Sequence, residues 1–279
     1  MQQLVEYHTE VGGLSTRALE LRGEGLGLVL LHGWGDSADT WRPLLDRLAR
    51  LGRGAIAVDL PTTDLPAGPM LPQLDAFAAE LIRGWAKRRE VVVVGNSLGG
   101  TVALRLAERA DLPLAGVVPV APAGLDMPRW FDVIDRDALV RALVALPLPR
   151  PALAGAISEV YRRLAFSAPQ AADQDAVQAY AAAHATRDGL ARLLGSGRRL
   201  LPELATPPFD FAAIACPVLL VWGTRDHMCP HRGARVLSEA LPRALVELID
   251  GCGHCPQLEA PGRLLELLSG FPEPALAAA

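Results

Sequence analysis

The residue whose type and setting most clearly indicate chemistry is Ser97. It is the third residue of the segment 95–99, Gly-Asn-Ser-Leu-Gly, which follows four consecutive valines and precedes a stretch with helical spacing of apolar residues. This is the G-x-S-x-G pattern of a nucleophile elbow, in which a strained turn between a strand and a helix exposes a serine hydroxyl above a sheet. Neighbouring backbone approaches such a turn closely, which favours glycine at its flanks. We therefore predict that Ser97 is a nucleophile.

Two further side chains with suitable chemistry follow later apolar segments. Asp226 comes just after 217–222, and His254 comes just after 244–249. A serine hydroxyl is a weak nucleophile at neutral pH, so a histidine must take its proton, and an acid must hold that histidine in the productive tautomer. The chain order serine, acid, histidine is a known order for such triads. We expect Ser97, Asp226 and His254 to form a catalytic triad.

Attack by a serine on an acyl carbon creates an oxyanion that needs preorganised hydrogen-bond donors. The elbow pattern assigns this role to two backbone N–H groups, those of Leu98 and Trp34. Trp34 belongs to the segment His-Gly-Trp-Gly at 32–35, directly after an apolar strand. We expect His32 to stabilise this loop and not to transfer protons.

Other acids compete with Asp226 for the third position of the triad. Asp36, Asp59 and Asp126 also follow predicted strands. Asp59 precedes Leu-Pro on what we interpret as a structural turn. Pattern and chain order favour Asp226.

These residues require a sheet that brings their loops together. Apolar segments alternate between strand-like and helix-like patterns, which predicts an α/β fold with a mostly parallel, twisted sheet and a site at the carboxyl ends of its strands. We expect strands at 4–10, 14–22, 26–31, 55–58, 91–94, 114–120, 217–222 and 244–249, and flanking helices at 38–51, 74–88, 101–109, 231–241 and 256–268.

Residues 125–205 interrupt this alternation. Four helical stretches are expected there, at 133–146, 151–166, 171–185 and 187–201, so we predict a helical cap inserted into a core made of 1–124 and 206–279. An apolar underside at helical spacing would form the wall of an acyl pocket. Its predicted members are Leu139, Leu143, Leu146, Leu153, Ile157, Val160 and Leu164, and the candidate substrate-pocket residues are Trp130, Phe131, Leu143 and Ile157.

Composition narrows the class of partners. With 51% hydrophobic residues, a net charge of −4 and a pI near 5.9, the chain gives no reason to expect nucleic acid or an anionic membrane as a partner. No apolar run reaches the ~18 residues of a membrane span, and the N-terminus lacks a secretory signal. We expect a cytoplasmic protein that acts on a small molecule without cofactor or metal.

The segment Cys252-Gly-His-Cys255 has two further interpretations. A C-x-x-C pair is a redox motif in thioredoxin-like proteins, but the surrounding arrangement of that fold is missing here. Zinc through Cys229, His231 and this pair would require spacings that do not match known sites. We therefore expect hydrolase chemistry to use His254, with these thiols reduced.

Taken together, the segments Gly-Asn-Ser-Leu-Gly-Gly, His-Gly-Trp-Gly, Asp-Leu-Pro, Gly-Thr-Arg-Asp and Gly-His-Cys-Pro resemble the α/β-hydrolase family over nearly the whole chain. Within it the sequence looks most like small bacterial carboxylesterases with a helical cap. The His-Gly-Trp-Gly opening is similar to that of esterases that cleave the methyl ester of a carrier-bound pimeloyl chain. The elbow is similar to that of hydrolases that cut carbon–carbon bonds of ring-cleavage products.

The resemblance implies a serine hydrolase that cleaves an ester of a small or medium apolar acyl group. Carbon–carbon bond or lactone hydrolysis with the same triad, or a receptor role, are the alternatives. An ester bound to an acyl carrier is one candidate substrate, although the cap, with ten arginines against nine acids, predicts no strongly basic surface for an acidic carrier.

Overall fold

The computed structural model describes residues 2–87, 89–127, 131–205 and 208–272. In this part of the chain, eight strands form one sheet in the order β1-β2-β4-β3-β5-β6-β7-β8. β2 is antiparallel to both of its neighbours, and all later pairs are parallel. The predicted α/β fold with a mostly parallel sheet is confirmed. The strands are β1 (Leu4–Val11), β2 (Leu14–Leu21), β3 (Glu24–Leu31), β4 (Arg53–Val58), β5 (Val91–Asn96), β6 (Leu114–Val120), β7 (Leu219–Gly223) and β8 (Leu245–Ile249).

Strand β5 illustrates why the valine run lies at the centre of the molecule. Val91 and Val93 pack into one hydrophobic core, and Val92 and Val94 pack into another on the opposite face. Successive side chains of a strand point to opposite faces, so a strand that is apolar at every position is stable only between two covered faces. β5 is an inner strand of the sheet. The turn that follows it therefore lies in the middle of the edge formed by the carboxyl ends of the strands.

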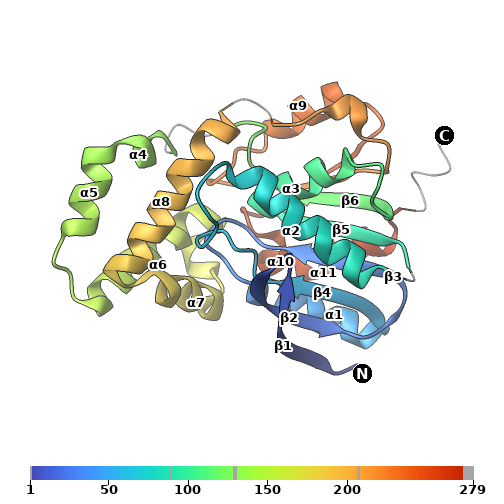
Figure 1. Ribbon diagram of the computed structural model, residues 1–279, viewed down its shortest axis with the longest axis horizontal. Coiled ribbons are helices and arrows are strands. Elements are labelled where there is room, and N and C mark those ends of the chain that lie inside the picture. Colours follow the sequence, from blue (N-terminus) through green and yellow to red (C-terminus); the bar gives the residue numbers. More distant parts are fainter. Residues whose placement is uncertain (1, 88, 128–130, 206–207, 273–279) are drawn as a thin grey trace.

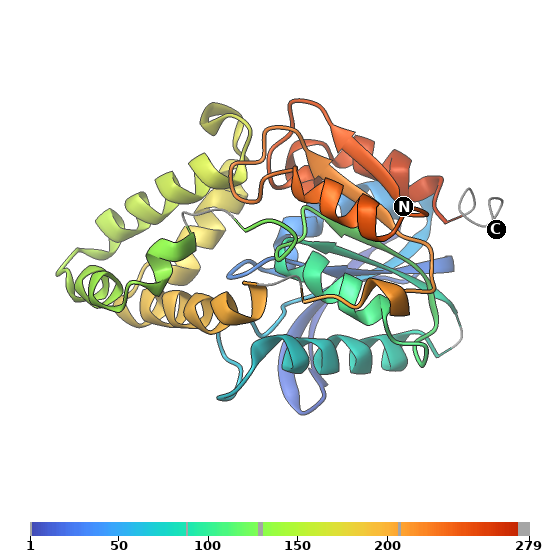
Figure 2. The same ribbon diagram turned by 90° about the horizontal axis from the view of Figure 1, so that it is seen from above.

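Helices cover both faces of the sheet, as Figures 1 and 2 show. The buried residues of α1 and α11 belong to one core, and those of α2, α3 and α9 belong to the other. The helices of this layer structure are η1 (Ala38–Trp41), α1 (Arg42–Leu51), α2 (Met70–Trp85), α3 (Leu98–Ala107), η4 (Phe211–Ala213), α9 (Gly233–Ala240), α10 (Pro256–Glu259) and α11 (Pro261–Ser269).

A second group of helices follows β6 and precedes β7, within the predicted insertion 125–205, which we call the cap segment. They lie together on one side of the molecule, at the left of Figure 1. They are α4 (Asp132–Asp135), α5 (Asp137–Ala145), α6 (Arg150–Ala165), η3 (Pro169–Ala171), α7 (Gln174–His184) and α8 (Arg187–Leu204). Among the described residues, no helix is long and apolar enough to cross a membrane.

Two boundaries in the cap segment differ from the prediction. The stretch 133–146 was expected to be one helix but is divided at Arg136, whose ψ of 86° is not helical. The helix expected to end at residue 201 continues through Pro202 to Leu204. Proline removes one helical hydrogen bond, but Leu200 and Leu204 are only 1% and 3% exposed, and their burial in the core offsets that loss.

The anchoring of α8 can be tested by Leu200→Ala. We expect the free energy of unfolding in urea to fall by about 2–5 kcal/mol, because the substitution leaves a cavity in the core. The matched control is Leu139→Ala on α5, where the side chain is 39% exposed; it should change stability by no more than ~0.5 kcal/mol. Equal effects of the two substitutions would show that α8 does not hold the cap segment to the core.

Candidate active site

Ser97 lies at the sharp turn between β5 and α3. Its φ of 54° and ψ of −116° are outside the regions that L-residues favour. The Ser97 N–H donates to the Val120 carbonyl at 2.9 Å, and the Ser97 carbonyl accepts from the Thr101 N–H at 3.0 Å. A Cβ atom on Gly95 would lie 2.0 Å from the Gly99 carbonyl oxygen, so only glycine fits there. The turn therefore has the strained geometry of an elbow.

Asp226 and His254 form a buried pair. His254 Nδ1 lies 2.8 Å from Asp226 Oδ2, and the two side chains are 3% and 0% exposed. The carboxylate also accepts from the indole N–H of Trp222 at 3.0 Å and from the backbone N–H groups of Met228 and Cys229 at 2.8 Å each. A carboxylate satisfied in this way holds the proton of His254 on Nδ1, which leaves the Nε2 lone pair as the base.

Ser97 and His254 line the same cavity but do not yet form a hydrogen bond. Among the described residues, His254 Nε2 is buried without a hydrogen-bond partner. The Ser97 hydroxyl instead contacts the thiol of Cys229. Serine–histidine hydrogen bonds are often long in the absence of substrate and tighten when it binds. The structure thus brings Ser97 and His254 to one cavity, while Asp226 is buried behind the cavity wall in contact with His254 Nδ1.

The loop that carries Trp34 is fastened at several points to the turn after β4. The Leu60 N–H donates to His32 Nε2 at 2.7 Å, and the Ala38 N–H donates to Asp59 Oδ1 at 2.7 Å. Between these two anchors, the Gly35 N–H donates to Thr62 Oγ1 at 3.2 Å. The buried His32 thus supports the loop, as expected, and Asp59 belongs to the fastening.

Leu98 offers its N–H from a different element. It is the first residue of α3, and the N–H at that position has no acceptor within its own helix. Both Trp34 and Leu98 line the cavity with Ser97. Trp34, in a loop, and Leu98, at the start of α3, are therefore the candidates for donating backbone N–H groups to an oxyanion at Ser97.

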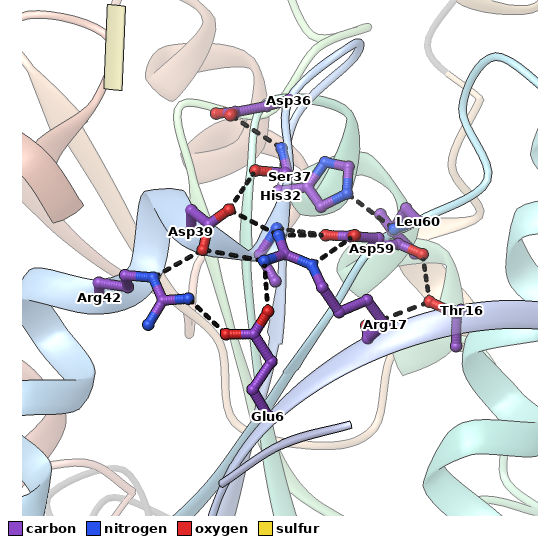
Figure 3. A network of polar contacts seen from close by, with 11 residues as sticks. Glu6, Thr16, Arg17, His32, Asp36, Ser37, Asp39, Arg42, Asp59 and Leu60 are labelled. Atoms are coloured by element: carbon purple, nitrogen blue, oxygen red, sulfur yellow. Dashed lines mark hydrogen bonds and ion pairs between the residues drawn. The ribbon is translucent and has the colours of Figure 1, made fainter. Parts of the chain in front are cut away.

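A network of ion pairs stabilises the turn at Asp59, to which the Trp34 loop is anchored (Figure 3). Arg17, on β2, donates to Asp59 at 3.0 Å, to Asp39 at 2.6 Å and to Glu6 at 3.1 Å. Arg42 joins Asp39 to Glu6 at 2.6 and 2.8 Å. The Arg17 side chain is only 18% exposed, so solvent screens these contacts less than it screens an ordinary surface pair.

The loop of His254 is held by the core and by the cap segment. The His254 N–H donates to the Ala165 carbonyl at 2.9 Å, at the end of α6. Asn96 donates its side-chain N–H to the His254 carbonyl at 2.9 Å. Glu259 accepts from the Gly253 N–H at 2.8 Å and from the Ser167 N–H at 2.9 Å. These contacts join the end of β5, the histidine loop and the residues that follow α6.

Above the triad lies a cavity of ≈ 380 Å³ between the core and the cap segment. Of the predicted pocket residues, Phe131, Leu143 and Ile157 line it, while Trp130 lies outside the described residues. Leu139, which we also predicted for the wall, does not line the cavity and is 39% exposed. That prediction was wrong: on α5, Leu143 lines the cavity and Leu139 does not. The other predicted wall residues line the cavity: Leu146, Leu153, Val160 and Leu164.

The competing side chains have other surroundings. Asp126 pairs with the exposed Arg232. Burial raises the pKa of the Cys252 thiol to about 12 and raises the pKa of Cys255 well above its usual range. A redox C-x-x-C pair needs a lowered thiol pKa, so these surroundings oppose thioredoxin-like chemistry. Among the described residues, no three His, Cys, Asp or Glu side chains gather as metal ligands would.

The sequence analysis missed several cavity residues. Asp36, Tyr161, Tyr180 and Cys229 line the cavity together with Ser97 and His254. Asp36 and Cys229 lie within the two loops already singled out, so their position along the chain was a usable signal. The two tyrosines lie on helices that carry several other polar residues, and only the folded chain shows which of these residues line the cavity.

The chain belongs to the α/β hydrolase family, whose model matches residues 28–267. Among curated relatives, the pimeloyl-[acyl-carrier protein] methyl ester esterase of Aromatoleum aromaticum is 31% identical over 268 residues, covering 84% of this chain and 93% of that protein. The enzyme of the same name from Chromobacterium violaceum is 30% identical over 247 residues, covering 86% and 91%. The family and these relatives support a hydrolase.

Solved structures agree on the fold. A membrane phospholipase A, described as a bacterial virulence factor, matches with a TM-score of 0.77 and 23% identity, covering 98% of this chain and 86% of that one. A serine hydrolase involved in carbazole degradation matches with a TM-score of 0.74 and 21% identity, covering 96% and 98%. At these identities the similarity shows the fold alone.

The role of the buried pair is tested by Asp226→Asn. Loss of the carboxylate should leave His254 in the wrong tautomer and lower kcat on p-nitrophenyl butyrate on the order of ten-thousandfold with the fold intact. Asp126→Asn is the matched control and should keep most activity. The assignment of the acid is wrong if Asp126→Asn causes the large loss and Asp226→Asn does not, with circular dichroism unchanged in both.

Proposed function

We propose that this protein is a serine hydrolase that cleaves carboxylic esters with an apolar acyl part through Ser97, His254 and Asp226. The observation that carries this proposal is the buried His254–Asp226 pair, 2.8 Å apart, whose free Nε2 atom lies in the same cavity as the strained serine turn. Esterase-named relatives at 30–31% identity support the same reaction class.

In the proposed mechanism, Ser97 Oγ attacks the acyl carbon while His254 Nε2 takes the hydroxyl proton. Asp226 stabilises the imidazolium that forms. The N–H groups of Trp34 and Leu98 bind the oxyanion, and the loss of one such donor costs about 3–4 kcal/mol in comparable enzymes. His254 then protonates the leaving alcohol, and a water molecule activated by the same histidine hydrolyses the acyl-enzyme.

The cap segment supplies the acyl pocket in this proposal. Leu143, Leu153, Ile157 and Leu164 line the cavity from α5 and α6, so an acyl chain would be covered by residues of the insertion. We therefore treat 125–205 as the cap and 1–124 with 206–279 as the core. Each methylene buried against such a wall contributes about 0.8 kcal/mol until the pocket is full.

The lining of the cavity also bears on the carbon–carbon hydrolase alternative. Ring-cleavage products carry a carboxylate, which needs a cationic partner when it is buried. None of the described residues that line the cavity is an arginine or a lysine. This supports a neutral ester substrate. A carrier-bound ester, as named for the relatives, is one such substrate.

The nucleophile is tested by Ser97→Ala, for which we expect a loss of roughly a millionfold in kcat, as in a comparable triad. The substitution should leave the melting temperature nearly unchanged, since the hydroxyl does not pack in a core. Hydrolysis of p-nitrophenyl butyrate measures the activity. More than a few per cent residual turnover in a contaminant-free preparation would remove Ser97 as nucleophile.

The receptor alternative makes a different prediction. If the protein is a receptor, the wild-type chain should hydrolyse the ester only slowly, and binding of a ligand should shift its melting temperature.

The acyl pocket is tested with p-nitrophenyl esters of graded chain length. We expect kcat/KM to rise from acetate to a medium chain and then to fall. Ile157→Phe should move the optimum to a shorter chain because the larger ring fills the cavity. The control, Leu139→Phe, lies outside the lining and should keep the wild-type optimum. An optimum that neither substitution moves would show that the cap does not set acyl specificity.

A further inference from the structure

Among the described residues, the polar side chains that line the cavity form two groups. One consists of Asn96, Ser97 and His254. The other, which we call the polar subsite, consists of Asp36, Tyr161 and Tyr180. Neither the triad nor the oxyanion donors explain why a carboxyl and two phenols lie in a cavity otherwise suited to an acyl chain.

Asp36 lies on the loop of Trp34, two residues after the proposed oxyanion donor. Its Oδ1 atom accepts from the Ser37 N–H at 2.8 Å. Asp36 is partly buried, and burial raises the pKa of its carboxyl. Among the described residues, no arginine or lysine forms an ion pair with it. The carboxyl is therefore a hydrogen-bonding group on the cavity wall that lacks a cationic partner there.

The two tyrosines lie opposite this loop, on α6 and α7. Their rings are stacked with centroids 4.1 Å apart and an interplanar angle of 5°. The Tyr180 hydroxyl lies 3.2 Å from the position that a Cβ atom on Gly35 would occupy, next to Asp36 in the chain. Burial raises the pKa of Tyr180 well above its usual value, and it does the same for Tyr161. Both phenols are therefore neutral at physiological pH and can each donate and accept a hydrogen bond.

Two observations connect the polar subsite to the residues around Ser97 and His254. Tyr161 packs in one buried cluster with Cys255, the residue that directly follows His254. His254 delivers the proton to the leaving alcohol in the proposed mechanism, so the alcohol must lie on its side of Ser97. Asp36 is two residues from Trp34, which limits the separation of their Cα atoms to ~7 Å. A group on the first few atoms of the alcohol can reach the polar subsite.

We propose that Asp36, Tyr161 and Tyr180 bind a hydroxyl group of the leaving alcohol, so that the preferred substrates are esters of a small diol or polyol with a medium apolar acid. This inference rests on the proposed ester hydrolysis. A hydroxyl group matches the subsite because it can both donate to the carboxyl and accept from a phenol. A carboxylate would be repelled by Asp36, and an alkyl group could not form a hydrogen bond to the carboxyl or to the phenols.

The test compares two esters of equal size, 2-hydroxyethyl hexanoate and propyl hexanoate, which differ by one hydroxyl in place of a methyl group. We expect the wild type to have a kcat/KM about tenfold or more higher for the hydroxyethyl ester, in line with one buried hydrogen bond. The double substitution Tyr161→Phe with Tyr180→Phe should bring the ratio of the two values close to one. Asp36→Ala should lower the ratio as well, and because the ratio is internal to each variant, a general loss of activity does not affect it.

The matched control is Tyr7→Phe, which removes a phenol that donates to Glu20 in the N-terminal hairpin. Its ratio should equal that of the wild type. A wild-type ratio near or below one, or a ratio that neither the tyrosine pair nor Asp36→Ala changes, overturns the inference. Hydrolysis of p-nitrophenyl hexanoate distinguishes failure of the polar subsite from failure of the proposed function. If the protein hydrolyses this ester but shows no preference for the hydroxyethyl ester, only the polar subsite is rejected. If it does not hydrolyse this ester, the proposed function is rejected together with the subsite.

Discussion

Direct packing of backbone on backbone at the carboxyl edge of the sheet is the constraint on which the site depends. A Cβ atom on Gly99 would lie 2.2 Å from the Leu31 carbonyl oxygen, and one on Gly223 would lie 2.1 Å from that of Gly253. The first contact sets the serine turn against the end of β3, and the second sets the loop of Asp226 against the loop of His254. Side chains of any size would push these loops apart, so glycine is required for the catalytic groups to converge.

Convergence also requires that the loops keep their conformations, and polar contacts provide this. The loop of Trp34 is anchored through His32 and Ala38 to the turn at Asp59, and the Arg17 network holds that turn (Figure 3). The His254 loop is joined to α6 through Ala165. The cap segment therefore contacts His254, the proposed general base, directly. A shift of α6 would move the His254 loop and would also change the shape of the proposed acyl pocket. Substrate binding in that pocket would therefore affect the position of His254.

The sequence predicted those features that local patterns determine. The four valines of β5, buried on both faces, and the strained turn at Ser97 follow from residue type and neighbours, so the sheet and the convergence of Asp226 and His254 were accessible. The continuation of α8 through Pro202 was not, because burial of Leu200 and Leu204 against the core decides it. The break at Arg136 was not predicted either. The pairing of Tyr161 with Tyr180 was equally inaccessible, since helix packing alone brings Asp36 and these two residues to one cavity wall.

The central claim is that Ser97 carries the acyl group, and covalent trapping tests it most directly. A fluorophosphonate reacts with an activated serine and leaves a stable adduct that peptide mapping by mass spectrometry can locate. The account predicts one adduct per chain, on Ser97, formed rapidly in the native protein and lost on heat denaturation before labelling. The thiol of Cys229 lies against Ser97, which makes it a close internal comparison. An adduct on Cys229 or on another serine, with Ser97 unmodified, would contradict the account.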